Sequence, residues 1–121
     1  MRKIILIVVF LIGSWIPSEI GAIPNFHNRG EMEAAARHDI QIWLSNNGFQ
    51  YTMEKLRLKY DLNTVKGMFG AMEALRWYTM NITYYLEDIR RYSGIKFTYS
   101  VNFDFKAAGV RVYVIRFYYF K

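Results

Sequence analysis

Residues 95–106, with the sequence IKFTYSVNFDFK, carry the clearest pattern in the chain and decide its expected fold. Apolar residues stand at every second position, and polar or charged residues stand between them. A period of two is typical of a β-strand with one face buried. The segment therefore predicts a sheet that has one face in water and the other face against a cover.

Strand-like patterns continue on both sides of this segment. Residues 56–63 (LRLKYDLN) alternate, residues 77–86 are rich in Tyr, Thr and Ile, and residues 110–120 are apolar on both faces, which predicts a central or covered strand. Residues 68–73, which follow Gly67 and contain Gly70, predict a loop, while residues 107–109 (AAG) are short enough for a hairpin connection. Four consecutive strands with short connections predict an antiparallel meander.

Only one segment shows helical spacing, and it covers residues 31–46. Its apolar stripe consists of Met32, Ala36, Ile40, Trp43 and Leu44. Asn28 or Gly30 can cap its start, and the run 46–48 (NNG) is a stop signal. The expected fold is therefore α+β, with one N-terminal helix packed on a four- to five-stranded antiparallel sheet. A second long helix between residues 53 and 77 would contradict this architecture.

The N-terminus has the layout of a secretory signal peptide. Arg2 and Lys3 precede nine apolar residues, 4–12, and the small pair Gly21 and Ala22 follows. The apolar run is shorter than the roughly 20 residues that span a bilayer. We expect residues 1–22 to be removed and residues 23–121 to form one domain, secreted to the extracellular space or to a vacuole and free of the membrane. A retained N-terminal anchor and a cut after Ser14 are the alternatives.

The amino-acid composition and net charge exclude several classes of function. The 121 residues include no cysteine, which excludes thiol catalysis, cysteine-bound zinc and disulfides. The net charge is +6, but the basic residues are spread along the expected strands rather than clustered. Such spacing is typical of a solvated face and does not predict a nucleic-acid partner.

Three short motifs, taken in order, resemble the cystatins and among them the plant cystatins. The lead-in 23–25 (IPN), the helical run 34–40 (AAARHDI) and the run 63–67 (NTVKG) stand where the family has its Pro-Asn lead-in, its helix motif and its first hairpin loop. The resemblance covers residues 21–121.

Cystatins inhibit papain-like cysteine proteases, so the resemblance implies a secreted, reversible inhibitor without cofactor or catalysis. It implies an N-terminal contact segment with Gly21, Ile23 and Pro24, and a second contact loop with Phe105 and Lys106. The first contact loop would consist of Asn63, Thr64, Val65, Lys66 and Gly67. Loops on a rigid sheet fill a groove with little loss of conformational entropy on binding.

Departures from the family pattern favour an alternative. Asn63 replaces the glutamine of the first loop, Lys66 replaces a small residue, and the stretch around Phe105 lacks the Pro-Trp pair. The alternative hypothesis is a non-inhibitory, secreted module of cystatin fold that binds another protein or a glycan.

Other candidate sites are few. His27 and His38 are the only histidines, and neither has the spacing of a metal site or a catalytic triad, so we expect surface histidines, no bound metal and no enzyme. Asn81 begins the sequon Asn-Ile-Thr and is a glycosylation candidate. The aromatic run 117–120 predicts a covered sheet face rather than a binding patch.

Overall fold

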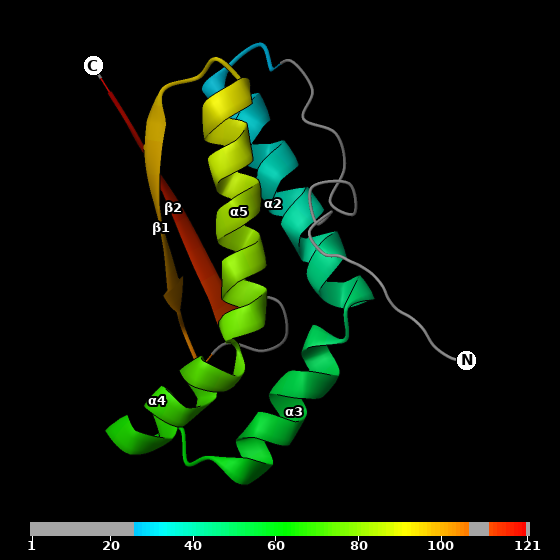
Figure 1. Ribbon diagram of the computed structural model, residues 1–121, viewed down its shortest axis with the longest axis vertical. Helices are drawn as coiled ribbons and strands as arrows, with labels where there is room; N and C mark the ends of the chain where they lie inside the picture. Colours follow the sequence, from blue (N-terminus) through cyan, green and yellow to red (C-terminus); the bar gives the residue numbers. More distant parts are fainter. Residues whose placement is uncertain (1–25, 107–111, 121) are drawn as a thin grey trace.

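The computed structural model describes residues 26–106 and 112–120 (Figure 1). The predicted signal peptide, Gly21, Ile23 and Pro24 lie outside these residues, as does the expected hairpin connection. The elements are α2 (Arg29–Asn46), α3 (Phe49–Lys59), α4 (Val65–Ala74), α5 (Arg76–Tyr92), β1 (Phe97–Phe103) and β2 (Tyr113–Tyr119). The described residues thus form four helices and a two-stranded sheet, and the expected single helix on a four- to five-stranded sheet is wrong.

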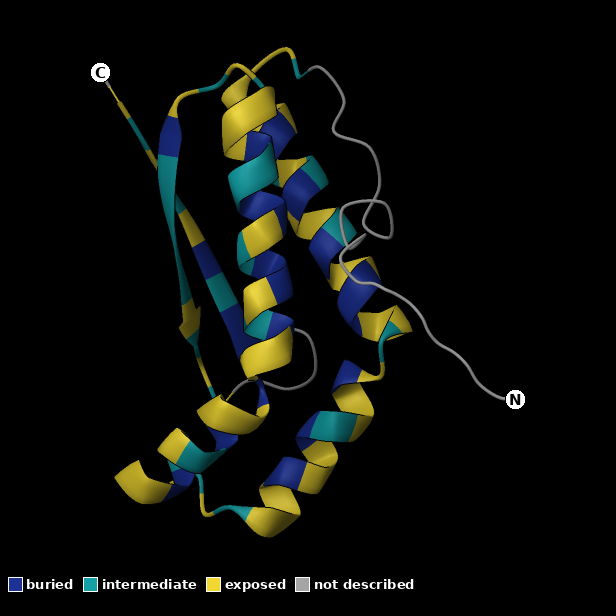
Figure 2. Cartoon of the chain, in the orientation of Figure 1, coloured by how far each residue is buried: buried dark blue, intermediate teal, exposed yellow. Residues whose placement is uncertain are grey.

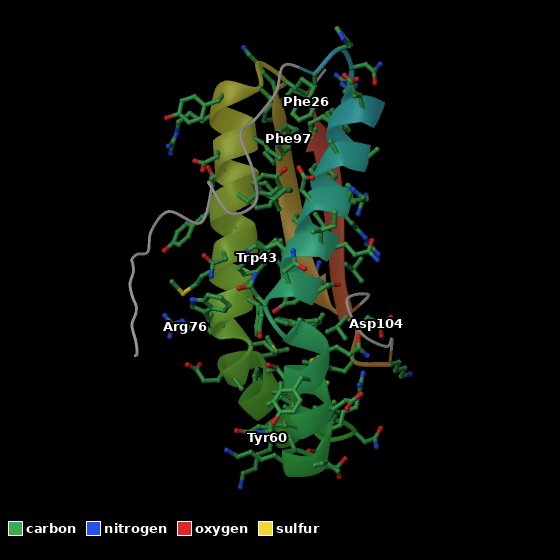
Figure 3. All side chains as sticks on the ribbon, turned by 90° about the vertical axis from the view of Figure 1, so that its right-hand side faces the viewer. Phe26, Trp43, Tyr60, Arg76, Phe97 and Asp104 are labelled. Atoms are coloured by element: carbon green, nitrogen blue, oxygen red, sulfur yellow. The ribbon has the colours of Figure 1, made fainter. Side chains whose placement is uncertain are left out.

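The hairpin runs along α2 and α5, while α3 and α4 form one end of the molecule, at the bottom of Figure 1. β1 and β2 are antiparallel, with Phe97 opposite Tyr119 and Phe103 opposite Tyr113. Figure 3 shows Phe26 and Phe97 near the end where α2 begins, Trp43 in the middle and Tyr60 at the far end. Figure 2 shows that α2 and α5 turn their buried residues inward, whereas the outer part of α4 is mostly exposed.

Two parts of the expectation are confirmed. Helix α2 begins at the predicted cap, because Asn28 Oδ1 accepts a hydrogen bond of 2.8 Å from the backbone N–H of Glu31. All five residues of its predicted stripe are buried. The alternation in residues 95–106 does form a strand, and it pairs with the last strand of the chain as a hairpin.

The expected strand at 56–63 is instead the end of α3 and the loop after it. Phe49, Met53 and Leu56 are the buried residues of α3, and they stand four and three positions apart. Leu58, which gave the segment its alternation, is 90 % exposed. The stop signal before it is real, since Gly48 has a φ of 71°, but another helix follows the turn directly.

The expected strand at 77–86 is instead the N-terminal part of α5. Its buried residues Tyr78, Ile82, Tyr85 and Ile89 recur every three or four positions. Tyr, Thr and Ile favour strands when a segment is judged by composition alone. Here the burial of one helical face overrides that preference, as tertiary packing often does.

The expected hairpin loop at 63–67 and the glycine loop at 68–73 are replaced by helix α4 and its cap. Thr64 Oγ1 accepts a hydrogen bond of 3.0 Å from the N–H of Gly67 and donates one of 2.8 Å to the carbonyl oxygen of Asp61. A methyl group on Gly67 would overlap that carbonyl, and one on Gly70 would overlap the ring of Tyr60. Both glycines therefore let α4 approach the chain that precedes it.

Aromatic side chains join the elements in the core. The ring of Phe49 lies 5.1 Å from that of Tyr78 and 5.3 Å from that of Tyr113, so α3, α5 and β2 meet at one point. β2 pairs only with β1 in the described part of the chain, so its expected central position is wrong. Its outer face carries the exposed residues Arg116 and Tyr118.

The close approach at Gly67 yields the first prediction. Gly67→Ala should lower the free energy of unfolding by about 1–3 kcal/mol, because the added methyl group forces α4 away from Asp61. Gly30→Ala is the matched control, since its methyl group would meet Asn28 Oδ1 at an ordinary 3.4 Å. That change should be neutral or stabilise by up to about 1 kcal/mol. Urea unfolding measures both, and equal effects of the two substitutions would contradict the packing described.

Candidate functional site

Helix α4 exposes three of its four large apolar side chains, and the fourth, Met68, is half-buried. Val65, Phe69 and Met72 stand four and three positions apart and are 64 %, 64 % and 38 % exposed. We call these three residues the α4 stripe. The opposite face of the helix buries Gly67 and Ala71. A surface helix ordinarily buries its large apolar residues and exposes small or polar ones, so α4 has the reverse arrangement.

A small groove of about 280 Å³ borders the α4 stripe. Its lining comes from α4, from the start of α5 and from the end of β1, and consists of Phe69, Met72, Glu73, Arg76, Thr79 and Phe103. Glu73 and Arg76 form an ion pair of 3.5 Å at its rim, with both side chains at least 70 % exposed. Such an exposed pair contributes little to stability and leaves both charges open to a ligand.

A larger groove of about 670 Å³ lies on the other side of α4. It is lined by Arg57, Tyr60, Asp61, Leu62, Asn63, Met68, Phe103, Asp104, Phe105 and Lys106. The rings of Phe103 and Phe105 are stacked there, 5.3 Å apart and nearly parallel. Phe103 lines both grooves, and the smaller groove also contains Phe69 and Met72 of the α4 stripe.

The structure brings some of the predicted site residues together. Asn63, Phe105 and Lys106 line the larger groove, although they do not lie at the tips of neighbouring hairpins as expected. Thr64 caps α4, while Val65, Lys66 and Gly67 form its first turn. Val65 and Lys66 are exposed and Gly67 is buried.

Asn81, the glycosylation candidate, lies in the middle of α5 and is 4 % exposed. Its Nδ2 donates a hydrogen bond of 2.8 Å to the backbone carbonyl of Trp77. A glycan on this residue would require the side chain to leave that bond and its buried position. Glycosylation of Asn81 stays a prediction.

The described residues offer few candidates for catalysis or metal binding. Residues 26–106 and 112–120 contain no group of three or more His, Asp or Glu side chains that could hold a metal ion. His27 and His38 are both exposed, as predicted. None of the helices found in the described ranges is both long enough and apolar enough to cross a membrane.

Three tyrosines bind carboxylates where the helices and the hairpin meet. Tyr85 donates to Asp39 at 2.7 Å, Tyr99 donates to Glu87 at 2.6 Å, and Tyr119 donates to Glu33. Burial, followed by these hydrogen bonds, raises the pKa of each tyrosine above its ordinary value. Burial also raises the pKa of Tyr113. These groups stay neutral at physiological pH and hold the fold together.

The sequence interpretation missed Phe69, Met72 and Phe103, which shape the candidate surface. The signal for the first two was available: Val65, Phe69 and Met72 have helical spacing, and glycines stand on the other face. Spacing alone predicts that such a stripe is buried, however, so it does not reveal the exposure.

No family model, curated protein or solved structure matches this chain. The resemblance to cystatins therefore stays a prediction from the motifs.

The raised tyrosine pKa values predict loss of stability in alkali. An unfolded tyrosine loses its proton near pH 10, whereas the folded tyrosines keep theirs to higher pH. The stability that this difference provides is therefore fully present below about pH 10 and is lost as the pH rises further. The urea midpoint should therefore fall steeply between about pH 10 and pH 11.5. Tyr85→Phe, although less stable at neutral pH, should show a shallower fall. A pH dependence identical in the two proteins would contradict this assignment.

Proposed function

We propose that the chain is a protein-binding module and that the α4 stripe is the centre of its contact surface. The observation that carries the proposal is the reversed packing of α4, which buries glycine and alanine while Val65, Phe69 and Met72 face solvent. Burying one large apolar side chain stabilises a protein by about 1.5–3 kcal/mol. Folding stability alone therefore gives no reason for this orientation, whereas a partner that covers the stripe does.

The surroundings of the stripe support a partner of specific shape. Grooves lie on both sides of α4, and both contain the ring of Phe103. Charged groups such as Arg76 and Asp104 stand at their margins, as the polar rim does around the apolar centre of many protein interfaces. Figure 3 shows Arg76 and Asp104 on opposite sides of the molecule, at a height between Trp43 and Tyr60. The proposed module acts by binding and not by catalysis.

Secretion remains part of the proposal. It rests on the basic, apolar and small residues of the first 22 positions, which lie outside the described part of the structure. N-terminal sequencing of the protein recovered from culture medium tests it, with Ile23 expected as the first residue.

Inhibition of papain-like proteases is the second candidate and is supported by the motif resemblance, with Asn63 and Lys106 lining one groove. Titration of papain with residues 23–121 tests it. An inhibitor that uses the 63–67 segment should be weakened by Lys66→Glu, an exposed change that leaves the fold intact. Full papain activity at micromolar protein would exclude this candidate.

The binding proposal predicts a clear difference between two surface substitutions. A partner is identified by affinity capture from the source tissue, purified, and measured by calorimetry. Phe69→Ser should raise its Kd about thirtyfold, because an aromatic residue central to an interface contributes about 2 kcal/mol or more. Leu58→Ser is the control, since Leu58 is 90 % exposed on α3 and outside both grooves. Equal Kd values for the two variants would overturn the proposal.

A further inference from the structure

The edge of β1 that faces away from β2 has no strand beside it in residues 26–106 and 112–120. The N–H of Asp104 donates a hydrogen bond of 2.7 Å to the carbonyl of Val112, directly opposite in the register of the hairpin. Because hydrogen bonding alternates along an antiparallel pair, the even positions Thr98, Ser100 and Asn102 bond to β2. The backbone N–H and C=O groups of the odd positions 97, 99, 101 and 103 point to the other edge.

This free edge lacks the usual devices that protect an edge strand. The sequence of β1, FTYSVNF, contains no charged residue, proline or glycine. The edge of β2 is different. Arg29 stacks 4.5 Å from the ring centre of Tyr119 and donates to the carbonyl of Phe120, and Arg37 stacks 5.2 Å from the ring centre of Phe117. The two edges are therefore not equivalent, since β2 also carries the charged residue Arg116, whereas β1 carries no charge.

A strand added to this edge would lie over α5. Figure 3 shows α5, β1 and β2 in that order across the molecule, so α5 lies on the open side of β1. The hydroxyl of Tyr99 reaches Glu87 of α5 from the buried face of the strand. The small groove, with Thr79 of α5 and Phe69 of α4 in its lining, begins at Phe103, the last residue of β1. The open edge thus leads directly to the α4 stripe.

We propose that the partner of the α4 stripe is an extended peptide segment of another protein, which adds to β1 as a third strand. This inference rests on the proposed function and names the chemistry of the partner. Backbone groups of β1 would provide affinity, and a side chain of the segment would enter the small groove between Phe69 and Phe103. The segment alternates apolar residues toward α5 and polar residues toward water.

Charge complementarity indicates one acidic end for this segment. Lys96 precedes β1 and Lys106 follows it, and neither forms an ion pair in the described part of the chain. The carboxylates of α5 nearest the strand are engaged, since Glu87 pairs with Arg90 and Asp88 with Arg91. The exposed carboxylate of Asp104 stands beside Lys106, so an approaching segment meets net positive charge at the Lys96 end of the strand, which favours an acidic flank there.

A second copy of the chain does not fit this edge. Antiparallel pairing of β1 with β1 requires a two-fold axis perpendicular to the sheet, which puts both α5 helices on the same face. Strands pair about 4.8 Å apart, whereas packed helices need about 8–10 Å. Because α5 lies on the open side of β1, the two copies of α5 would overlap.

A synthetic peptide of alternating valine and threonine, with aspartates at both ends, is a suitable probe. With isotope-labelled protein, NMR should show that the peptide protects the amides of Tyr99 and Val101 from hydrogen exchange, while the amide of Ser100 is already protected by β2. Replacing the terminal aspartates by lysines should weaken binding about tenfold, because a lysine then meets the like charge of Lys96 in either orientation of the peptide.

N-methylated peptides make the test independent of protein folding. One isomer is methylated on every valine nitrogen and the other on every threonine nitrogen. Only one of the two edges of the peptide pairs with β1, so one isomer should lose binding and the other should retain it. Loss with the valine isomer identifies antiparallel addition, and loss with the threonine isomer identifies parallel addition. If both isomers bind as well as the unmodified peptide, or if the unmodified peptide does not bind at millimolar concentration, the inference is overturned.

A protein variant separates this inference from the proposed function. Val101→Pro removes an N–H that points to the open edge and leaves the bonds to β2 intact. It should abolish binding of the peptide and of the captured partner. If Phe69→Ser weakens the partner but Val101→Pro does not, the protein-binding proposal stands and strand addition fails. A dimer in the absence of peptide, with Tyr99 and Val101 already protected, would also overturn the inference.

Discussion

The buried side chain of Tyr113 ties together the parts of the fold on which the candidate surface depends. Its hydroxyl donates a hydrogen bond of 3.2 Å to the carbonyl of Leu75, the residue between α4 and α5, and lies 3.1 Å from Thr79 Oγ1. Its ring packs 5.3 Å from that of Phe49 and 5.0 Å from that of Phe103. One residue of β2 thereby fixes the corner from which α4 projects. Leaving this hydroxyl unpaired in the core would be costly, which favours the present position of Leu75 and with it the direction of α4.

Sequence patterns could predict the first helix and the hairpin because each shows one unambiguous period. The stripe of α2 and its Asn28 cap agree with each other, and the alternation of β1 has no competing helical spacing. Between residues 49 and 92 the spacing of apolar residues fits both a helix and a strand. Leu56 and Leu58 alternate with charged residues, but Leu56 is also the last member of a helical series that begins at Phe49. Burial decides between the two readings, and burial depends on tertiary contacts such as the ring of Phe49 against Tyr113.

The candidate surface was less accessible to prediction than the fold. Asn63, Phe105 and Lys106 were expected to lie near one another, and they do line one groove. Asn63, however, lies in the loop before α4, and Phe105 and Lys106 follow the end of β1. Gly67 was expected in a loop that contacts a protease, whereas it is buried and allows close approach of Asp61 within the same chain. The exposure of Phe69 reverses the usual rule for helices, and no rule of spacing or composition could have predicted it.

Hydroxyl-radical footprinting of the purified full chain tests the central claim most directly, because it reports the exposure of individual side chains in solution. Phe69 and Phe49 belong to neighbouring helices, and their exposed fractions are 64 % and 0 %. The account predicts rapid oxidation of Phe69 and near-complete protection of Phe49 in the folded protein. Equal protection of the two phenylalanines would show that the α4 stripe is covered within the protein itself and would contradict its role as a binding surface.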